Sequence, residues 1–205
     1  MGLTFHTLLW DLLPGRRSRQ GAASGRTGRT TVTDAPPGPR GKSPRQARYD
    51  ELVAEMKAEH GIRVNKWRGS TSGCAWEVTY RDGAVSRLIE SPYPRGPMSC
   101  AVFMHEVGHH AIGLHRYRPR CLEEFHAWRW GLEEMTRRGF SVTDRVLARR
   151  DDALRYAVEK ALRRGLRRLP VELAPWAPSS AFAGTTPERR LANQAKTSIS
   201  DPRLV

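Results

Sequence analysis

The chain has 205 residues and a formal net charge of +14 at pH 7, a length that suits one domain with tails. Its three cysteines are irregularly spaced, which argues against a disulfide framework and for a reducing compartment. Residues 1–13 are too short to span a bilayer and lack the basic start of a targeting peptide, so we expect a soluble cytoplasmic protein with no membrane partner.

The positive charge is unevenly distributed. Residues 1–48 carry nine basic and two acidic residues, residues 49–144 carry thirteen of each, and residues 145–168 carry nine basic and three acidic. The excess therefore lies in an N-terminal tail and in a late segment, each of which suits contact with nucleic acid. The neutral segment between them has no such bias.

The N-terminal part predicts a tail followed by a helix. Residues 1–43 are expected to form a disordered basic tail, because residues 14–43 are rich in Gly, Pro, Ser, Thr and Arg. Ser43 and Pro44 supply a capping hydroxyl and a first-turn proline, and Gly61 ends the helix. Its apolar stripe consists of Tyr49, Leu52, Val53 and Met56.

Three short strands are expected next. The first starts at Ile62, the second covers the alternating residues 74–80, and the third is Val85–Glu90 after an Asp82-Gly83 hairpin turn. We predict a small antiparallel sheet. Val85–Glu90 is the candidate edge strand, either for pairing with an extended substrate or as an ordinary edge protected by its charges.

A mostly apolar helix over roughly 98–113 contains the one segment that indicates a chemistry, His105-Glu106-Val107-Gly108-His109. Residues i and i+4 lie on one face of a helix, so the imidazoles of His105 and His109 can hold one metal ion. Neutral imidazole suits zinc, and Glu106 lies beside the first ligand, where it can take a proton from a zinc-activated water.

A second helix, over residues 122–135, is expected to supply the third ligand. Its apolar stripe consists of Leu122, Phe125, Trp128, Leu132 and Met135. At about 100° per residue, Glu124 borders this stripe, whereas Glu123 and His126 point toward solvent. Glu124 is therefore the predicted third ligand, and Glu123 is predicted to lie on a solvated face.

Other ligands stay open. His115 follows His105 by ten residues, as in metzincins, but Ile112 stands where that pattern has a bending glycine. Glu123 and His126 also stay open as the third ligand, although His126 can equally be a surface histidine, and Cys121 is an alternative ligand or a packed side chain. His110 points about 100° away from its neighbour and is expected in a supporting or surface position.

The run from His105 to His110, followed by an acidic and aromatic helix, resembles the gluzincin-like ImmA/IrrE metallopeptidases and, more loosely, the SprT-like zincins. The likeness extends over residues 44–140. It implies a zinc peptidase in which Glu124 is the third ligand. It also implies an acidic residue four positions later that steadies a metal-binding histidine, but this chain has Trp128 there.

A last helix is expected over residues 145–168, capped by Asp144 and stopped by Pro170, with a basic face. Residues 171–205 are expected to form a disordered tail. The domain thus spans residues 44–170 and has the α+β class: a minimal zincin-like domain with an N-terminal helix, a small antiparallel sheet, two metal-binding helices and a C-terminal basic helix.

The function predicted from these features is a zinc-dependent peptidase that hydrolyses a protein or peptide. Glu106 is its general base, His105, His109 and Glu124 hold Zn²⁺, and His126 or His110 is a candidate oxyanion donor. The alternative is a nucleic-acid-associated protein whose zinc site is structural or degenerate. A structural zinc takes a fourth protein ligand, for which Cys121, His115 and His126 are candidates.

Overall fold

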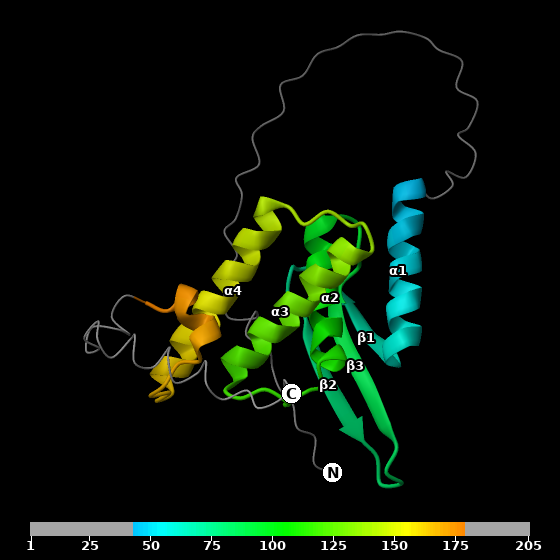
Figure 1. Ribbon diagram of the computed structural model, residues 1–205. Helices are drawn as coiled ribbons and strands as arrows, with labels where there is room; N and C mark the ends of the chain where they lie inside the picture. Colours follow the sequence, from blue (N-terminus) through cyan, green and yellow to red (C-terminus); the bar gives the residue numbers. More distant parts are fainter. Residues whose placement is uncertain (1–42, 179–205) are drawn as a thin grey trace, which may run out of the picture.

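The computed structural model describes residues 43–178, which form an α+β domain (Figure 1). Its elements in chain order are α1 (Pro44–His60), β1 (Ile62–Arg68), β2 (Cys74–Thr79), β3 (Val85–Pro92), α2 (Pro97–Ala111), α3 (Arg120–Arg137), α4 (Asp144–Arg163) and the 3₁₀ helix η2 (Val171–Trp176). Within the described residues, no helix is both long and apolar enough to cross a membrane. The predicted tails at 1–42 and 179–205 lie outside the described residues.

Helix α1 begins and ends where the sequence predicts. The Ser43 hydroxyl accepts a hydrogen bond from the Gln46 backbone N–H at 3.2 Å, which satisfies one free donor of the first turn. Gly61 follows the helix with φ +62°, a conformation that glycine adopts at little cost. The predicted stripe is buried and belongs to the core, as Tyr49, Leu52, Val53 and Met56.

The sheet differs from the prediction in two ways. Its strand order is β1-β3-β2, and β1 pairs with β3 in parallel, so the sheet is mixed rather than antiparallel. The strand Val85–Glu90 lies in β3, at the centre of the sheet, and is not an edge strand. Its charges pair across strands: Arg87 Nε donates to Glu77 Oε1 at 3.3 Å, and Arg68 Nε donates to Glu90 Oε2 at 2.9 Å.

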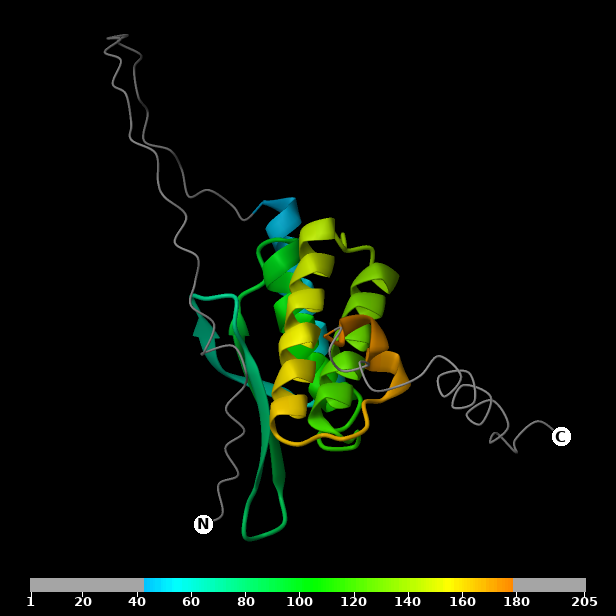
Figure 2. The ribbon, with the colours of Figure 1, turned by 90° about the vertical axis from the view of Figure 1, so that its left-hand side faces the viewer.

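The turn between β2 and β3 is the predicted hairpin. Tyr80 N–H donates to the Ala84 carbonyl at 2.8 Å, and the Asp82 carboxylate accepts from Ala84 N–H at 3.0 Å. Gly83 has φ +83°, which explains why glycine stands there. Figure 2 shows the helices gathered on one side of the sheet, with this hairpin extending past them.

Helix α2 lies in the middle of the domain and contacts β3 on one side and α3 on the other. Eleven consecutive residues, Cys100 to His110, are buried. A helix that is buried on all sides carries few charges, so the ionisable groups in this run are costly to place there and need an explanation.

The C-terminal part extends beyond the predicted boundary. Thr143, rather than Asp144, caps α4, and α4 ends at Arg163 because Gly165 turns the chain with φ +89°. Residues 171–178 are not a tail. Leu173 in η2 is fully buried, and Trp176 Nε1 donates to Asp151 Oδ1 at 2.9 Å, which fastens η2 to α4. Proline and serine content suggested disorder, but two large apolar side chains suffice to anchor this short segment.

Candidate metal centre

Two histidines of α2 form the base of the site. His105 and His109 are one helical turn apart, both fully buried, with ring centroids 4.7 Å from each other. Their Nε2 atoms have no hydrogen-bond partner. Two buried imidazoles whose Nε2 atoms point toward the same place form a natural ligand pair.

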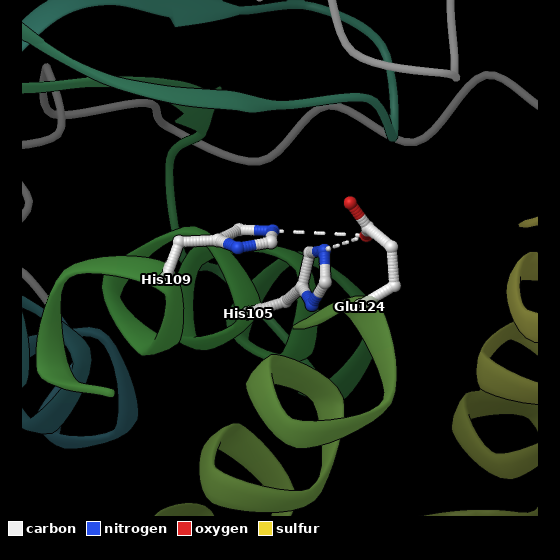
Figure 3. Close-up of side chains that lie close together, drawn as sticks. All are labelled: His105, His109 and Glu124. Carbon is white, nitrogen blue, oxygen red and sulfur yellow. Dashed lines mark ion pairs between the residues drawn. The ribbon is translucent and has the colours of Figure 1, made fainter. Parts of the chain in front are cut away.

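Glu124 of α3 completes the group. Its Oε2 lies 3.2 Å from His105 Nε2 and 3.6 Å from His109 Nε2, and one ligand atom from each residue lies within 4.8 Å of the others (Figure 3). Two ligands of a tetrahedral zinc, each about 2.0–2.1 Å from the ion, are roughly 3.3 Å apart. The structure thus brings together the three residues predicted as ligands, at spacings at which they could hold one metal ion.

The short distance between α2 and α3 depends on two glycines. A Cβ atom on Gly108 would lie 2.7 Å from the carbonyl oxygen of Ala127, and one on Gly131 would lie 3.0 Å from the backbone of Met104. Each glycine therefore lets the backbone of the other helix approach. This close approach allows the short carboxylate side chain of Glu124 to reach histidines on the neighbouring helix.

Glu123 is buried, which corrects the prediction that it faces solvent. Only 1% of it is exposed; its Oε1 accepts from His109 Nδ1 at 3.2 Å and its Oε2 accepts from the His115 backbone N–H at 3.0 Å. The loop after α2 folds back over this face of α3 and covers it. Glu123 therefore supplies a carboxylate that orients His109, one position before Glu124 rather than four after it.

Arg120 links the two carboxylates and was not predicted as a site residue. Its Nε donates to Glu124 Oε1 at 3.0 Å and its Nη1 donates to Glu123 Oε1 at 2.6 Å. Because Arg120 binds Oε1 of Glu124, the other oxygen, Oε2, faces His105 and His109. The signal was present in the sequence, because an arginine three and four residues before two glutamates on a helix is placed to bridge them.

Trp128 occupies the position where the resemblance implies an acidic residue. Its ring stacks on the imidazole of His105, with centroids 4.4 Å apart and planes at 22°. The two histidines are therefore oriented differently, His105 by an aromatic ring and His109 by the carboxylate of Glu123.

Glu106 is fully buried beside the ligand group, and neither of its carboxylate oxygens has a hydrogen-bond partner. Burial raises its pKa to about 8. An uncompensated buried carboxyl is costly, so its presence on this helix favours a chemical role over a packing role.

The charges within the group favour a positive charge between its side chains. Burial alone would lower the pKa of His109, but the Glu124 charge and the hydrogen bond to Glu123 raise it to about 9. Burial opposes ionisation of Glu124 as well, yet His109 and His105 keep its pKa well below the usual range. A positive charge between these side chains is therefore stabilised, as a proton or as a metal ion.

The alternative ligands lie outside this group of ligand atoms. His115 has φ +63° and a half-exposed side chain, and Cys121 is buried in the hydrophobic core. His126 stacks on Tyr117, with ring centroids 3.9 Å apart. Among the described residues, only His105, His109 and Glu124 form a group of three or more side chains that could hold a metal.

His110 is buried rather than on the surface. Its Nε2 lies 3.0 Å from the carbonyl oxygen of Leu88, so it ties α2 to the central strand. Burial lowers its pKa to about 4. Its contact with the sheet gives it a structural part and leaves the predicted oxyanion role without support.

Comparison of the chain with protein-family models, with curated proteins and with solved structures finds no match.

Proposed function

We propose that this protein is a zinc-dependent peptidase. The observation that carries the proposal is the convergence of His105, His109 and Glu124 at zinc-like spacings, with the buried and unpartnered carboxyl of Glu106 beside them. Three protein ligands leave one coordination position open, as catalytic zinc sites do. Two imidazoles and one carboxylate suit zinc better than magnesium or calcium, which prefer oxygen ligands alone.

Bound zinc would act as a Lewis acid and lower the pKa of water toward about 7. Glu106 is the general base that takes the proton from the attacking water and later delivers it to the leaving amine. Neither carboxylate oxygen of Glu106 has a hydrogen-bond partner, which supports this part because both stay available to accept that proton.

Three side chains position the ligands. Arg120 orients Glu124 through Oε1, Glu123 holds His109 through Nδ1, and Trp128 packs on the ring of His105. Removing such supports commonly lowers metal affinity about 10- to 100-fold.

The substrate class we propose is a protein or peptide. Among the described strands, β2 pairs only with β3, which leaves its other edge for an extended chain. This edge begins at the active centre, because Gly73, next to the first residue of β2, lies against the carboxyl of Glu106. The edge strand of this proposal is thus β2, in place of Val85–Glu90.

The test combines metal analysis with cleavage of a peptide library followed by mass spectrometry. Wild type should bind one zinc with two imidazoles, one carboxylate and one water by X-ray absorption. Glu106→Gln should keep the zinc and lose cleavage, and Glu124→Ala should lose the zinc. Glu133→Gln is the matched control, since that side chain is 69% exposed.

Two results would sink the proposal. The first is a zinc with four protein ligands that Glu124→Ala leaves unchanged, which would make the metal structural. The second is full cleavage by Glu106→Gln, which would remove the general base.

A second candidate function is binding of nucleic acid, with the zinc site structural or degenerate. It is favoured by the exposed arginines where α4 ends, which are Arg163, Arg164, Arg167 and Arg168. It predicts binding of a duplex DNA or RNA probe that falls steeply with salt and survives Glu124→Ala. No binding at low salt would end this candidate.

A further inference from the structure

Glu106 is fully buried, and the end of the chain between β1 and β2 lies directly against its carboxyl. This connection, residues 69–73, has the sequence Gly-Ser-Thr-Ser-Gly. A Cβ atom on Gly73 would lie 2.4 Å from Glu106 Oε1, so the backbone there rests directly on the carboxyl. Ser72 is buried as well. In this arrangement a substrate carbonyl has no path to Glu106 from the side of residues 69–73.

The connection is fastened to the sheet on one side. Arg68, the last residue of β1, donates from Nη1 to Ser72 Oγ at 3.0 Å and from Nε to Glu90 Oε2 at 2.9 Å. Within the connection, the hydroxyls of Ser70 and Ser72 are 2.7 Å apart. These polar contacts are local, since all the groups belong to the sheet or to its own loop.

The fastening on the other side comes from a distant part of the chain. Arg149 of α4 donates from Nη2 to the carbonyl oxygen of Thr71 at 3.0 Å, across 78 residues of sequence. The guanidinium is partly buried, and burial lowers its pKa. The bond itself is exposed, and its charged donor makes it stronger than a hydrogen bond between neutral groups.

We propose that residues 69–73 form a lid over the metal centre, latched by Arg149, which must open before a substrate reaches Glu106. The glycines at both ends are suited to the backbone rotations of a hinge, and the small hydroxyl residues between them leave few apolar contacts to break. Opening frees the carboxyl of Glu106 and the adjoining start of β2 together.

The part of this inference that concerns access of substrate rests on the proposed peptidase function. The closure of residues 69–73 over Glu106 and its latching by Arg149 do not. The experiment therefore has one arm that needs zinc and one that does not.

The test compares Arg149→Ala with Arg150→Ala. Arg150 is the neighbouring residue on α4, but its contacts are with Asp151 and the ring of Trp176. In the zinc arm, the rate at which a chelator removes zinc should rise about tenfold in Arg149→Ala and stay unchanged in Arg150→Ala. In the zinc-free arm, amide hydrogen exchange at residues 70–74 should rise by a similar factor only in Arg149→Ala.

Amides of α2 serve as the internal reference, because a globally destabilised variant would speed their exchange too. Ser72→Ala, which loses the bond from Arg68 without touching α4, is the second variant and should loosen the same residues. Unchanged exchange at residues 70–74 in both variants would overturn the lid. A protein that binds no zinc would end the peptidase proposal while the exchange arm still decides the lid.

Discussion

Gly108 of α2 lies against the backbone carbonyl of Ala127 in α3 so closely that an added Cβ would be 2.7 Å from the oxygen. Real Cβ atoms do not approach a carbonyl oxygen that closely, so any larger residue at 108 must move one helix. Since two of the proposed ligands belong to α2 and the third to α3, this contact sets how closely the three can approach one another.

We therefore expect Gly108→Ala to destabilise the fold and weaken zinc binding together. Alanine favours a helix over glycine by up to about 1 kcal/mol, but overpacking against a rigid backbone costs about 1–3 kcal/mol, so the net effect should be a loss. Urea denaturation and zinc titration measure the two effects. Gly96→Ala is the control, because the nearest atom to its Cβ position is Arg45 Nη2 at 3.9 Å; equal stability of all three proteins would contradict the close-packing argument.

Glu123→Gln tests the carboxylate that holds His109. The substitution keeps the shape but removes the charge that His109 Nδ1 and Arg120 share at Oε1. Zinc affinity should fall about 10- to 100-fold while the fold is retained. Competition with a chelator of known affinity gives the value, and Glu133→Gln on the exposed face of α3 should match wild type. If Glu123→Gln binds zinc as tightly as wild type, Glu123 does not support the site.

The pH dependence of the zinc-free protein reports on His110. Burial lowers its folded-state pKa to about 4, below the unfolded value of about 6.5. Between these values the unfolded chain binds a proton that the folded protein does not, so stability falls as the pH drops from 6.5 toward 4. The loss from this one group is at most about 3 kcal/mol.

His110→Gln should remove that part of the acid destabilisation. The free energy of unfolding in urea, measured at pH 6.5, 5.5 and 4.5, should fall less steeply in the variant than in wild type. Parallel curves would mean that His110 titrates normally and that its contact with the Leu88 carbonyl is not kept in solution.

Leu173 should be essential to the C-terminal end of the domain. It is fully buried in η2, so Leu173→Ala should cost about 2–5 kcal/mol. Val171, two residues before it, is 60% exposed and provides the control Val171→Ala. Thermal unfolding distinguishes them; equal melting temperatures would show that the domain ends before residue 171, as the sequence pattern predicts.

Local patterns predicted the parts of this protein that depend on neighbours along the chain. Ser43 and Gly61 mark the ends of α1, the Asp82-Gly83 pair marks the hairpin, and the i, i+4 spacing of His105 and His109 places both on one face. Each of these signals acts within one helical turn or one hairpin, so it can be recognised without knowing what packs against it.

Glu124 was also predicted, from its angle to the apolar stripe of α3, but the same angle argument failed for Glu123. Periodicity gives the direction of a side chain from its own helix axis. It does not tell which other elements cover that direction, and the loop after α2, with the backbone of His115, covers Glu123.

The tertiary structure alone decided the strand order, the burial of Glu123 and the covering of Glu106 by residues 69–73. Residues far apart in sequence meet where β1 pairs with β3 and where Arg149 donates a hydrogen bond to Thr71. They also meet where Leu173 packs into the hydrophobic core. Such contacts depend on how whole elements pack, since burial of a polar group becomes favourable only when partners from other elements satisfy it. The chain thus encodes the chemistry of the site locally, whereas its geometry and its access come from packing between elements.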